Sequence, residues 1–581
     1  MHFSHSLSGA PGRAGRITGG NGKQRGQAIV LVLLLTIAGV LIALSLVNTG
    51  ILTSEKMQLQ NAADATAFSV STLEARDLNF AAYTNRAMVA NEVAIGQMVG
   101  LMSWAVMANS TPEYLDLWIG KPLNALMGTP AAFIPIAFQT VLGVLRTVTR
   151  AVRSGVRTFA TTPVNPFSIP AMRSLNKFYS VAQQIMHMAT LSMSAGTLFD
   201  MIDANADGGK LSLFGYLALA RHFTTYYAEI SGGKETFVGS YSQDSTSDAQ
   251  KAGMQRLAAL VNASRDPFSK DRDGGWSIPI IPTIRIHFNV RLPKILGGGC
   301  LVCVDISYGV SVDRNGGSDL RYTTRSKKQL YNWSAVDTLA GNMDFQCYIN
   351  LLGVKLCNFH ERPGLPFGIG GAQVAKTTSQ MRAADMWPHF AGGEVPDEGY
   401  GKSPVISPVA WLWSSPVPGD GGPYFAVNRN NLDRKYTGLP NYHDTKAGPD
   451  PVKIDANLKF GWEAPYLLIA LYKPMQDISQ SSATGRFSLN SGAAHDELDV
   501  LGKSEVYFSR PNDLGYFARA DGKTELANAF NPYWDARLVD TSYIDRIAVI
   551  SMSQRQPWAL QNVAEPLQKF LQLLSFIPGL P

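Results

Sequence analysis

The chain of 581 residues lacks the short motifs that mark the common catalytic sites. It contains no GxSxG, no HExxH, no P-loop and no GxGxxG that opens a helix. Its nine histidines are scattered, and none stands near a serine or cysteine in a recognisable catalytic order. We therefore expect a non-enzymatic protein with no catalytic residue, no metal site and no cofactor.

A dense basic patch is also lacking. The net charge is +6, and no basic run alternates with aromatic residues, so we expect no nucleic-acid partner. Part of the excess is a stripe at helical spacing, formed by Arg146, Arg150, Arg153 and Arg157. We interpret this stripe as a solvated helix face, with contact to anionic lipid headgroups as the alternative.

No acidic residue occurs before Glu55. Within that stretch the 20 residues from Ala28 to Val47, AIVLVLLLTIAGVLIALSLV, carry no charge. A helix of this length spans about 30 Å, which matches the hydrocarbon core of a bilayer. The chain is therefore predicted to be a single-pass protein whose first partner is the lipid of the membrane.

The flanks of this apolar segment predict its orientation. Four basic residues and no acid precede it: Arg13, Arg16, Lys23 and Arg25. Basic flanks stay in the cytoplasm, so the N-terminus is expected inside and the bulk outside. A cleaved signal peptide is the alternative, but its apolar region usually has about 7–15 residues and ends at a small-x-small site. We find no clear site of that kind and favour an uncleaved anchor.

The helix is expected to continue beyond the membrane, because no proline occurs from Gln27 until Pro112. Apolar residues recur close to a 3.6-residue period in the second half of this stretch. Gly50, Gly96 and Gly100 are weak points where the helix could break. From Pro112 to about Arg265 the pattern stays mostly helical, with loops at residues 163–170 and 203–209.

One part of the helical region, between Lys121 and Arg146, carries no charge and is strongly apolar. A second membrane span is one interpretation, but Asn124, Gly128, Pro130 and Pro135 interrupt the segment. We favour a helix that is buried or lies at the membrane surface.

The pattern changes after Asp266. Ile284 to Leu292 alternates strictly between apolar and polar residues, which predicts a half-buried strand. Val302 to Val312 repeats the pattern and runs into DRNGGSD, which predicts a hairpin turn. The predicted fold is α+β and has five segments: a cytoplasmic tail (1–27), a transmembrane helix (28–52), a membrane-proximal helix (53–110), a mostly helical region (111–265) and a β-rich domain with a C-terminal helix (266–581).

All four cysteines lie in the β-rich part: Cys300, Cys303, Cys347 and Cys357. An exported domain meets an oxidising compartment, so disulfides are the first interpretation. Cys347 and Cys357 lie symmetrically about Leu352, in a stretch that predicts a hairpin, which favours pairing these two. Pairing between the two clusters, a zinc site and free thiols are the alternatives.

The loop DANADGG, from Asp203 to Gly209, matches the first half of a calcium-binding loop. The twelfth position, where a bidentate glutamate belongs, is Phe214. A surface turn rich in Asx residues accounts for the same letters, so calcium binding is the minor alternative.

The apolar segment and its continuation, RGQAIVLVLLLTIAGVLIALSLVNTG and SEKMQLQNAADATAFS, resemble the start of TadE/TadG-like proteins of the Flp (tight adherence) pilus assembly system. The most specific part is LQNAADATA, Leu59 to Ala67. Ala75 to Gln97 and NPYWDARL, Asn531 to Leu538, are also similar to longer relatives. Prepilins of this system carry Glu five residues past a cleaved glycine, whereas the residue at that distance from Gly26 is Leu31.

This resemblance implies a bacterial inner-membrane protein with a pilin-like helix and a periplasmic bulk. It also implies a structural or accessory role in pilus assembly or secretion, with other pilus-assembly or pilin-like proteins as partners. A membrane-tethered periplasmic enzyme or ligand-binding protein is the alternative. Independently, four small residues just outside the membrane suit close helix packing: Ala62, Ala63, Ala65 and Ala67. Their effect on helix propensity is the simpler account.

Overall fold

The computed structural model describes most of the first half of the chain and separate segments of the second half. These are residues 27–227, 237–244, 247–270, 272, 274–275, 285–293, 300–325, 328–351, 354–361, 364–374, 438–445, 466–478, 497–508, 525, 527–543, 545–547 and 549. The C-terminal helix expected beyond residue 550 and most of the stretch from 375 to 465 lie outside the described residues.

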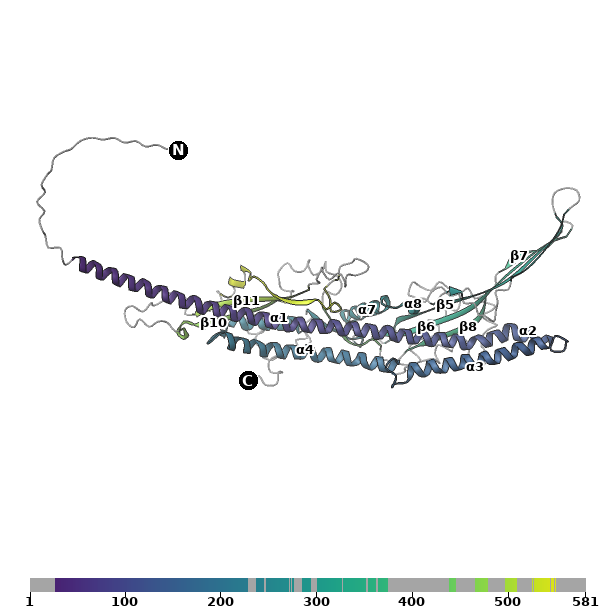
Figure 1. The fold of residues 1–581 in the computed structure, drawn as a ribbon, viewed down its shortest axis with the longest axis horizontal. Coiled ribbons are helices and arrows are strands. Elements are labelled where there is room, and N and C mark those ends of the chain that lie inside the picture. Colours follow the sequence, from purple (N-terminus) through teal and green to yellow (C-terminus); the bar gives the residue numbers. More distant parts are fainter. Residues whose placement is uncertain are drawn as a thin grey trace, which may run out of the picture.

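Helix α1, Gln27–Leu115, is the axis of the molecule and runs unbroken for 89 residues. At 1.5 Å per residue it is about 130 Å long. Figure 1 shows it extending from the N-terminal end to the far end of the rod, with other elements along both sides. The predicted anchor and the membrane-proximal helix are thus one continuous element, and α1 passes through Pro112 before it ends.

Two of the three glycines expected to weaken α1, Gly96 and Gly100, have another role, which explains why the helix does not break there. A Cβ on Gly96 would lie 2.6 Å from the ring of Trp333, and one on Gly100 would lie 2.6 Å from the Ser318 hydroxyl. Both glycines therefore allow the strands that carry Trp333 and Ser318 to approach the helix closely. The packing of the sheet outweighs the propensity cost of about 1 kcal/mol per glycine.

After α1 the chain is mainly helical up to Lys270, and in Figure 1 helices α3 and α4 lie on one side of α1 and α7 and α8 on the other. Helices α4 and α5 are capped at their N-termini by Ser168 and Ser212, whose hydroxyls accept backbone N–H groups of the first turn. The N-cap residue of α3, Ala132, has no side chain that could do this. The predicted loop at 163–170 is confirmed, because α3 ends at Thr161 and α4 begins at Ile169. The helical elements are η1 (Asp116–Gly120), α2 (Lys121–Leu123), η2 (Asn124–Leu126), α3 (Phe133–Thr161), α4 (Ile169–Asn205), α5 (Leu213–Tyr226), α7 (Asp248–Ala263), α8 (Pro267–Lys270) and η5 (Met475–Asp477).

The described strands form three antiparallel sheets, in the orders β1-β10-β11-β12, β2-β9 and β3-β5-β6-β7, with β4 added beside β5 and β8 beside β6. Their bounds are β1 (Lys210–Leu211), β2 (Val238–Tyr241), β3 (Gly274–Gly275), β4 (Arg285–Pro293), β5 (Cys300–Arg325), β6 (Lys328–Leu351), β7 (Val354–Glu361), β8 (Gly364–Gln373), β9 (Tyr442–Thr445), β10 (Tyr466–Pro474), β11 (Glu497–Phe508) and β12 (Trp534–Leu538). The strand predicted from Ile284 to Leu292 is confirmed as β4.

The hairpin predicted at DRNGGSD is wrong. Strand β5 runs through it and turns only after Arg325, which pairs with Lys328 of β6. Residues 316–320 are buried, and neighbouring helices hold their backbone in the extended form. The amide of Asn262 bonds both the N–H and the C=O of Leu320, and the N–H of Arg272 donates to the C=O of Gly316 over 2.7 Å. Local turn propensity therefore loses to this tertiary pairing.

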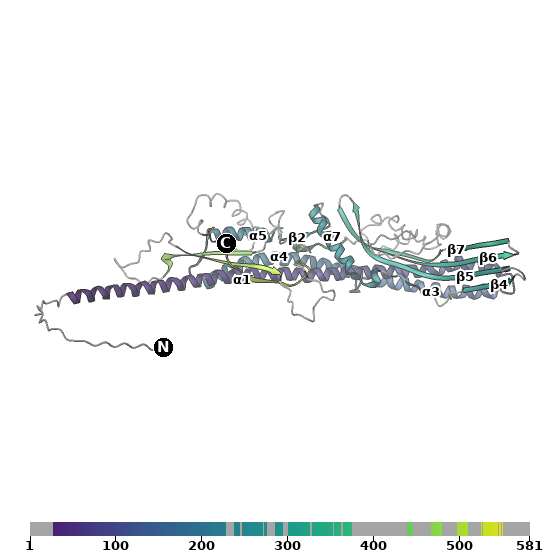
Figure 2. The ribbon, with the colours of Figure 1, turned by 90° about the horizontal axis from the view of Figure 1, so that it is seen from above.

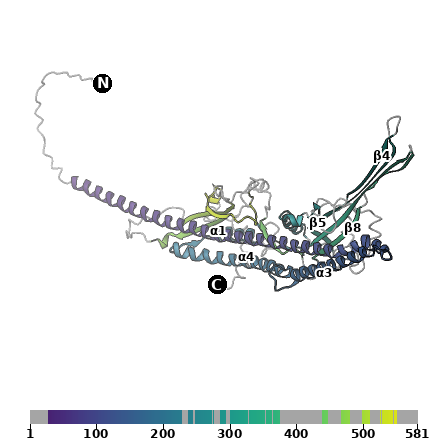
Figure 3. The same ribbon diagram turned by 45° about the vertical axis from the view of Figure 1, so that its right-hand side comes forward.

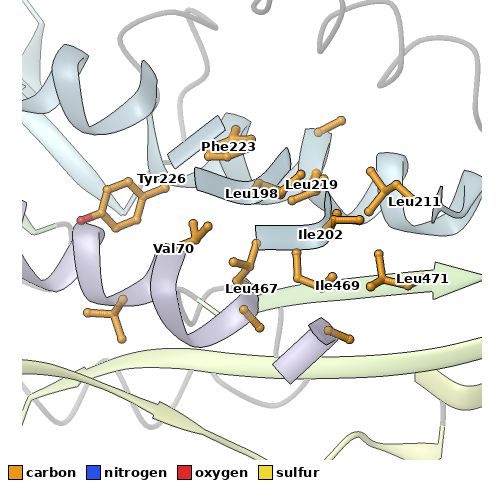
Figure 4. Packing of buried hydrophobic residues seen from close by; sticks show 14 of the residues in the cluster. Val70, Leu198, Ile202, Leu211, Leu219, Phe223, Tyr226, Leu467, Ile469 and Leu471 are labelled. Carbon is orange, nitrogen blue, oxygen red and sulfur yellow. The ribbon is translucent and has the colours of Figure 1, made fainter. Parts of the chain in front are cut away.

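The long β5–β6 hairpin and its neighbours β4 and β7 extend away from the helices at the far end of the rod (Figures 1 and 3), and Figure 2 shows these strands side by side there. Nearer the middle, β8 packs on α1, where Gly370 lies against the backbone of Met107 and Ser103. Two main cores hold the rest together, and each contains residues of α1, of the later helices and of the strands. Figure 4 shows one of them, where Val70 of α1 meets Leu198 and Ile202 of α4, helix α5 and strand β10.

Candidate functional site

The membrane-directed end of α1 is the first candidate site. Residues 28–43 are exposed, and only Leu44 and Asn48 among residues 28–50 are partly covered. Among the described residues this is the one helix long and apolar enough to cross a bilayer, and none of its most apolar stretch is buried. A core helix of a soluble protein would be buried there, so the exposure favours lipid as the surrounding solvent.

Polar side chains in and near this segment have hydrogen-bond or ion-pair partners. The hydroxyl of Thr36 donates to the C=O of Leu33 over 2.8 Å, as a hydroxyl inside lipid must. Glu55, the first acidic residue, forms an ion pair with Lys473 at the end of β10, with 2.7 Å between Oε2 and Nζ. This pair marks the level at which the rest of the chain first contacts α1 through charged groups.

Beyond Glu55, polar side chains of α1 form hydrogen bonds with strands and loops that lie far away in the sequence. We call these side chains the clamps. The amide of Asn79 donates to the C=O of Trp534 over 2.8 Å and accepts its N–H over 3.0 Å. Arg86 donates to the side-chain oxygen of Asn531 over 2.8 Å. Ala75–Gln97 and Asn531–Leu538, the two segments noted as similar to longer relatives, therefore lie side by side.

Glutamate 74 of α1 forms a buried pair with His222 of α5. The Nε2 atom of His222 lies 2.6 Å from Oε1 of Glu74, and its Nδ1 lies 2.9 Å from the C=O of Tyr466. The Tyr466 carbonyl can only accept, so Nδ1 carries a proton, and with an ionised Glu74 the Nε2 atom donates as well, which makes the imidazole cationic. Burial acts to lower the pKa of His222, but the Glu74 charge and hydrogen bond, with the Tyr466 carbonyl, outweigh it and raise the pKa.

One turn later, Asp77 of α1 pairs with Nδ1 of His187 on α4. The distance from Oδ2 of Asp77 to Nδ1 of His187 is 2.6 Å. The His187 ring lies against Tyr226, Tyr227 and His443, with ring centroids 4.7–5.9 Å apart. The side chains of these acid–histidine pairs are at most 5 % exposed. They are closed to a substrate, and their geometry ties three helices together rather than offering a reactive group.

Strand β9 supplies a third buried acid, Asp444. Its Oδ1 accepts the N–H of Thr445 over 2.8 Å and the N–H of Ala529 over 3.1 Å, and Arg256 lies 3.8 Å away. Burial raises the pKa of Asp444 to about 6, although these two N–H groups and Arg256 act to lower it. The charged carboxylate is therefore poorly solvated in the folded chain, and the cost of this burial depends on pH.

The four alanines predicted to pack a helix are placed close to the membrane-directed end of α1. Ala62, Ala63 and Ala67 are fully buried, and Ala65 is partly exposed. A Cβ on Gly502 of β11 would lie 2.6 Å from the carbonyl carbon of Ala63. Ser504 of the same strand donates its hydroxyl to the C=O of Ala67. The chain's own strand β11 thus packs against Ala63 and Ala67, and contact of this alanine face with a helix of another protein stays a prediction.

The cysteines are placed only through the backbone of β5, β6 and β7, because their side chains lie outside the described part. The hairpin predicted around Leu352 is confirmed, since Leu351 pairs with Val354. Within it Cys347 lies opposite Phe359, and Cys357 lies opposite Ile349. Cys303 lies opposite Asn350, and Cys300 opposite Pro293. The pairing of all four cysteines stays a prediction.

The candidate calcium loop begins inside a helix. Asp203 and Asn205 belong to the last turn of α4, and the amide of Asn205 donates to the C=O of Met201. Gly208 has a φ of +71°, which makes the turn into β1. The part of the chain that the structure describes contains no group of three His, Cys, Asp or Glu side chains placed to hold a metal ion.

The clamps on α1 are the residues that sequence reasoning missed. Glu74 and His222 are 148 positions apart, and Asn79 and Trp534 are 455 apart. Periodicity shows that a polar residue faces inward but cannot name its partner. The signal that was present is the run of Glu, Asp and Asn residues on the inward face of a helix that is otherwise apolar there.

Comparison with known proteins gives one match. Residues 26–75 match the family model Tad, described as putative Flp pilus-assembly TadE/G-like. The matched range covers the exposed apolar segment, Glu55 and the buried alanines, and ends one residue past Glu74. No curated protein and no solved structure matches the chain. Together, the exposed apolar helix and this match suggest that the chain is anchored in a membrane and takes part in Flp pilus assembly.

Proposed function

We propose that the chain is a single-pass inner-membrane accessory component of Flp pilus assembly, with a cytoplasmic N-terminus and a periplasmic rod. The observation that carries the proposal is the continuity of α1. Its membrane-directed end matches the pilus-assembly family model, and the same helix becomes the buried axis of the folded bulk. The rod is therefore fixed rigidly to its anchor and stands out from the membrane.

Several features support an uncleaved anchor. The helix continues without interruption from Ala28 into the core at Leu59, so a cut between these residues would remove part of the rod's own axis. The ion pair between Glu55 and Lys473 and the contact between Ala63 and Gly502 hold the next turns in place. The charge asymmetry of the N-terminal flank supports the orientation.

A structural role fits the chemistry of the described residues. The buried histidines are paired with carboxylates and enclosed, and their bonds join α1 to α4 and α5. Such pairs hold helices in register. No described residue set supports a reaction, so the proposed role is mechanical: to hold a partner-binding rod at a fixed distance from the membrane.

The proposal is tested by deletion and complementation in a cell that makes Flp pili. Loss of the gene should abolish or strongly reduce surface pili, and the full chain should restore them. A chain whose residues 28–47 are replaced by a cleavable signal sequence should fold and be exported but should not restore pili. Normal piliation in the deletion strain, or full rescue by the unanchored chain, would overturn the proposal.

A further inference from the structure

The outer half of the β5–β6 hairpin, residues 300–310 and 343–351, forms a four-stranded sheet with β4 and β7, and we call this sheet the arm. Figures 1 and 3 show that the arm diverges from the helices. Helix α7 meets β5 in its other half, where Asn262 bonds the backbone of Leu320. Among the described elements, β4 and β7 contact chiefly the strands beside them, so the described helices form no layer over the arm.

The arm has one apolar face and one polar face. Residues that pair directly across an antiparallel sheet lie on the same face, and successive residues of a strand alternate between the two faces. One face therefore consists of four rows that cross all four strands: Leu292, Val302, Leu351 and Val354; Val290, Val304, Ile349 and Cys357; Phe288, Ile306, Cys347 and Phe359; and Ile286, Tyr308, Phe345 and Glu361. We call it the apolar face, because Glu361 at its corner is the only charged residue among these sixteen positions.

The opposite face carries charges on three of the four strands. It includes Arg285, His287 and Arg291 of β4, Asp305 of β5 and Lys355 of β7. The Nη2 atom of Arg291 lies 4.0 Å from Oδ2 of Asp305, and the side chain of Arg291 is 72 % exposed. This face is therefore in water. An antiparallel sheet with one solvated polar face needs a cover for its other, apolar face.

A second copy of the same face has the charge and the area that such a cover needs. Two copies of a charged face would repel one another, but the apolar face is uncharged apart from its corner at Glu361. Four strands about 4.8 Å apart and about nine residues long make a face of about 20 by 30 Å. Two such faces bury on the order of 1,000 Å², which is about the area that a specific interface requires.

The anchor favours this pairing over a meeting of free molecules. Helix α1 is continuous from the apolar segment to Leu115, and strands β5 and β6 pack on it at Gly100 and Gly96. Copies anchored in one membrane therefore hold their arms at the same height, and a two-fold axis along the membrane normal brings like faces together. The anchoring bilayer cannot cover the arm, which lies at the other end of the rod (Figure 1).

We propose that the arms of two copies pack through their apolar faces into a two-layer β-sandwich, which joins two rods at the ends that lie away from the membrane. The sheets lie about 10 Å apart with nearly aligned strands. Each copy keeps its polar face, with Arg291 and Asp305, in water. The inference rests on the proposed function only for the shared membrane that holds the two copies in parallel.

The test places the photo-crosslinking residue p-benzoylphenylalanine at Ile306, in full chains that carry two different affinity tags in one native cell. Ser307, the next residue of β5 and on the polar face, carries the same residue as the matched control. We expect crosslinks between differently tagged chains from position 306 and a yield from position 307 that is lower by about tenfold or more, because adjacent strand residues lie on opposite faces.

A charge placed on each face gives a second comparison. With the crosslinker at 306, Val304→Asp should lower the yield by about tenfold or more, because pairing would bury an unpaired carboxylate. Ser307→Asp adds the same charge to the polar face and should change the yield by less than about twofold. In detergent that separates the copies, the melting temperature of both variants should stay within about 2 °C of the parent.

Several outcomes overturn the inference. Crosslinks confined to one chain, for example to residues 375–437, would mean that the chain covers its own apolar face. Crosslinks only to lipid or to another protein, equal yields from 306 and 307, or no crosslink would contradict the pairing as well. The proposed function fails separately: a crosslinked pair in cells that keep their pili without the gene counts against the function alone, and pilus loss without any crosslink counts against the sandwich alone.

Discussion

The side-chain amide of Asn79 pairs with both backbone groups of Trp534, much as a neighbouring strand would. Its Nδ2 donates to the C=O over 2.8 Å and its Oδ1 accepts the N–H over 3.0 Å. One residue of α1 thus holds the start of β12, 455 positions away, against the axis of the rod. Asn85 joins two further segments to α1 by donating to the C=O groups of His443 and Ala529.

Replacing Asn79 with alanine should lower the free energy of unfolding by about 2–3 kcal/mol, because two partly buried backbone groups of Trp534 lose their partners. Asn61→Ala is the matched control, since Asn61 is exposed on the same helix. It should change stability by less than about 0.5 kcal/mol. Chemical unfolding of the detergent-solubilised chain measures both, and equal values for the two variants would show that the clamp is not formed.

Gly502→Ala tests the contact between β11 and the alanine face of α1. The added methyl group would lie 2.6–2.9 Å from backbone atoms of Ala63 and Asp64, which cannot move without displacing the helix. We expect a loss of at least about 2 kcal/mol. Gly143→Ala has open space around it on α3 and should instead stabilise the chain by up to about 1 kcal/mol. A neutral Gly502→Ala would contradict the described packing.

The Glu74–His222 pair should make stability depend on pH above about 6.5. The folded state raises the pKa of His222 above its ordinary value of 6.5. Its contribution is therefore fully present below about pH 6.5 and is lost as the pH rises through the folded value. In Glu74→Gln the hydrogen bond can remain but the charge does not, so the melting temperature should fall less between pH 6.5 and 9 than in the parent. Parallel curves would count against a cationic His222.

Asp444 should make the free energy of unfolding depend on pH in a lower range. Burial raises its pKa from 3.8 to about 6, so the protonated form favours folding and that stability is lost as the pH rises from about 4 through 6. A shift of about two units corresponds to roughly 3 kcal/mol. Asp444→Asn keeps an oxygen for the N–H groups of Thr445 and Ala529. Relative to the parent, it should become more stable between pH 4 and pH 7, as followed by thermal unfolding.

Local patterns in the sequence predicted much of the architecture. The uncharged run from Ala28, the absence of proline up to Pro112 and the alternation in 284–292 correspond to the exposed end of α1, its length and β4. These features depend on the residues themselves and their immediate neighbours. The division of the chain into five segments stays a prediction. Each of the two main cores contains residues of α1, of later helices and of strands.

What could not be predicted depends on distant partners. The turn signal at DRNGGSD was overridden because Asn262 and Arg272 bind the backbone of β5 there. Gly96 and Gly100 read locally as weak points, yet they are where Trp333 and Ser318 meet the helix. The exposed valines of α3, among them Val144 and Val148, were missed because the arginine pattern directed the interpretation to charge and because exposure depends on the fold.

The most direct test of the account is the topology of the whole chain. An alkaline phosphatase that is active only outside the cytoplasm is fused after Pro581, and the membranes are extracted with alkaline carbonate. The account predicts an active phosphatase on a full-length chain that stays in the membrane pellet, and a chain released to the soluble fraction when residues 28–47 are replaced by a cleavable signal sequence. An inactive phosphatase, or a full-length parent chain recovered in the soluble fraction, would contradict it.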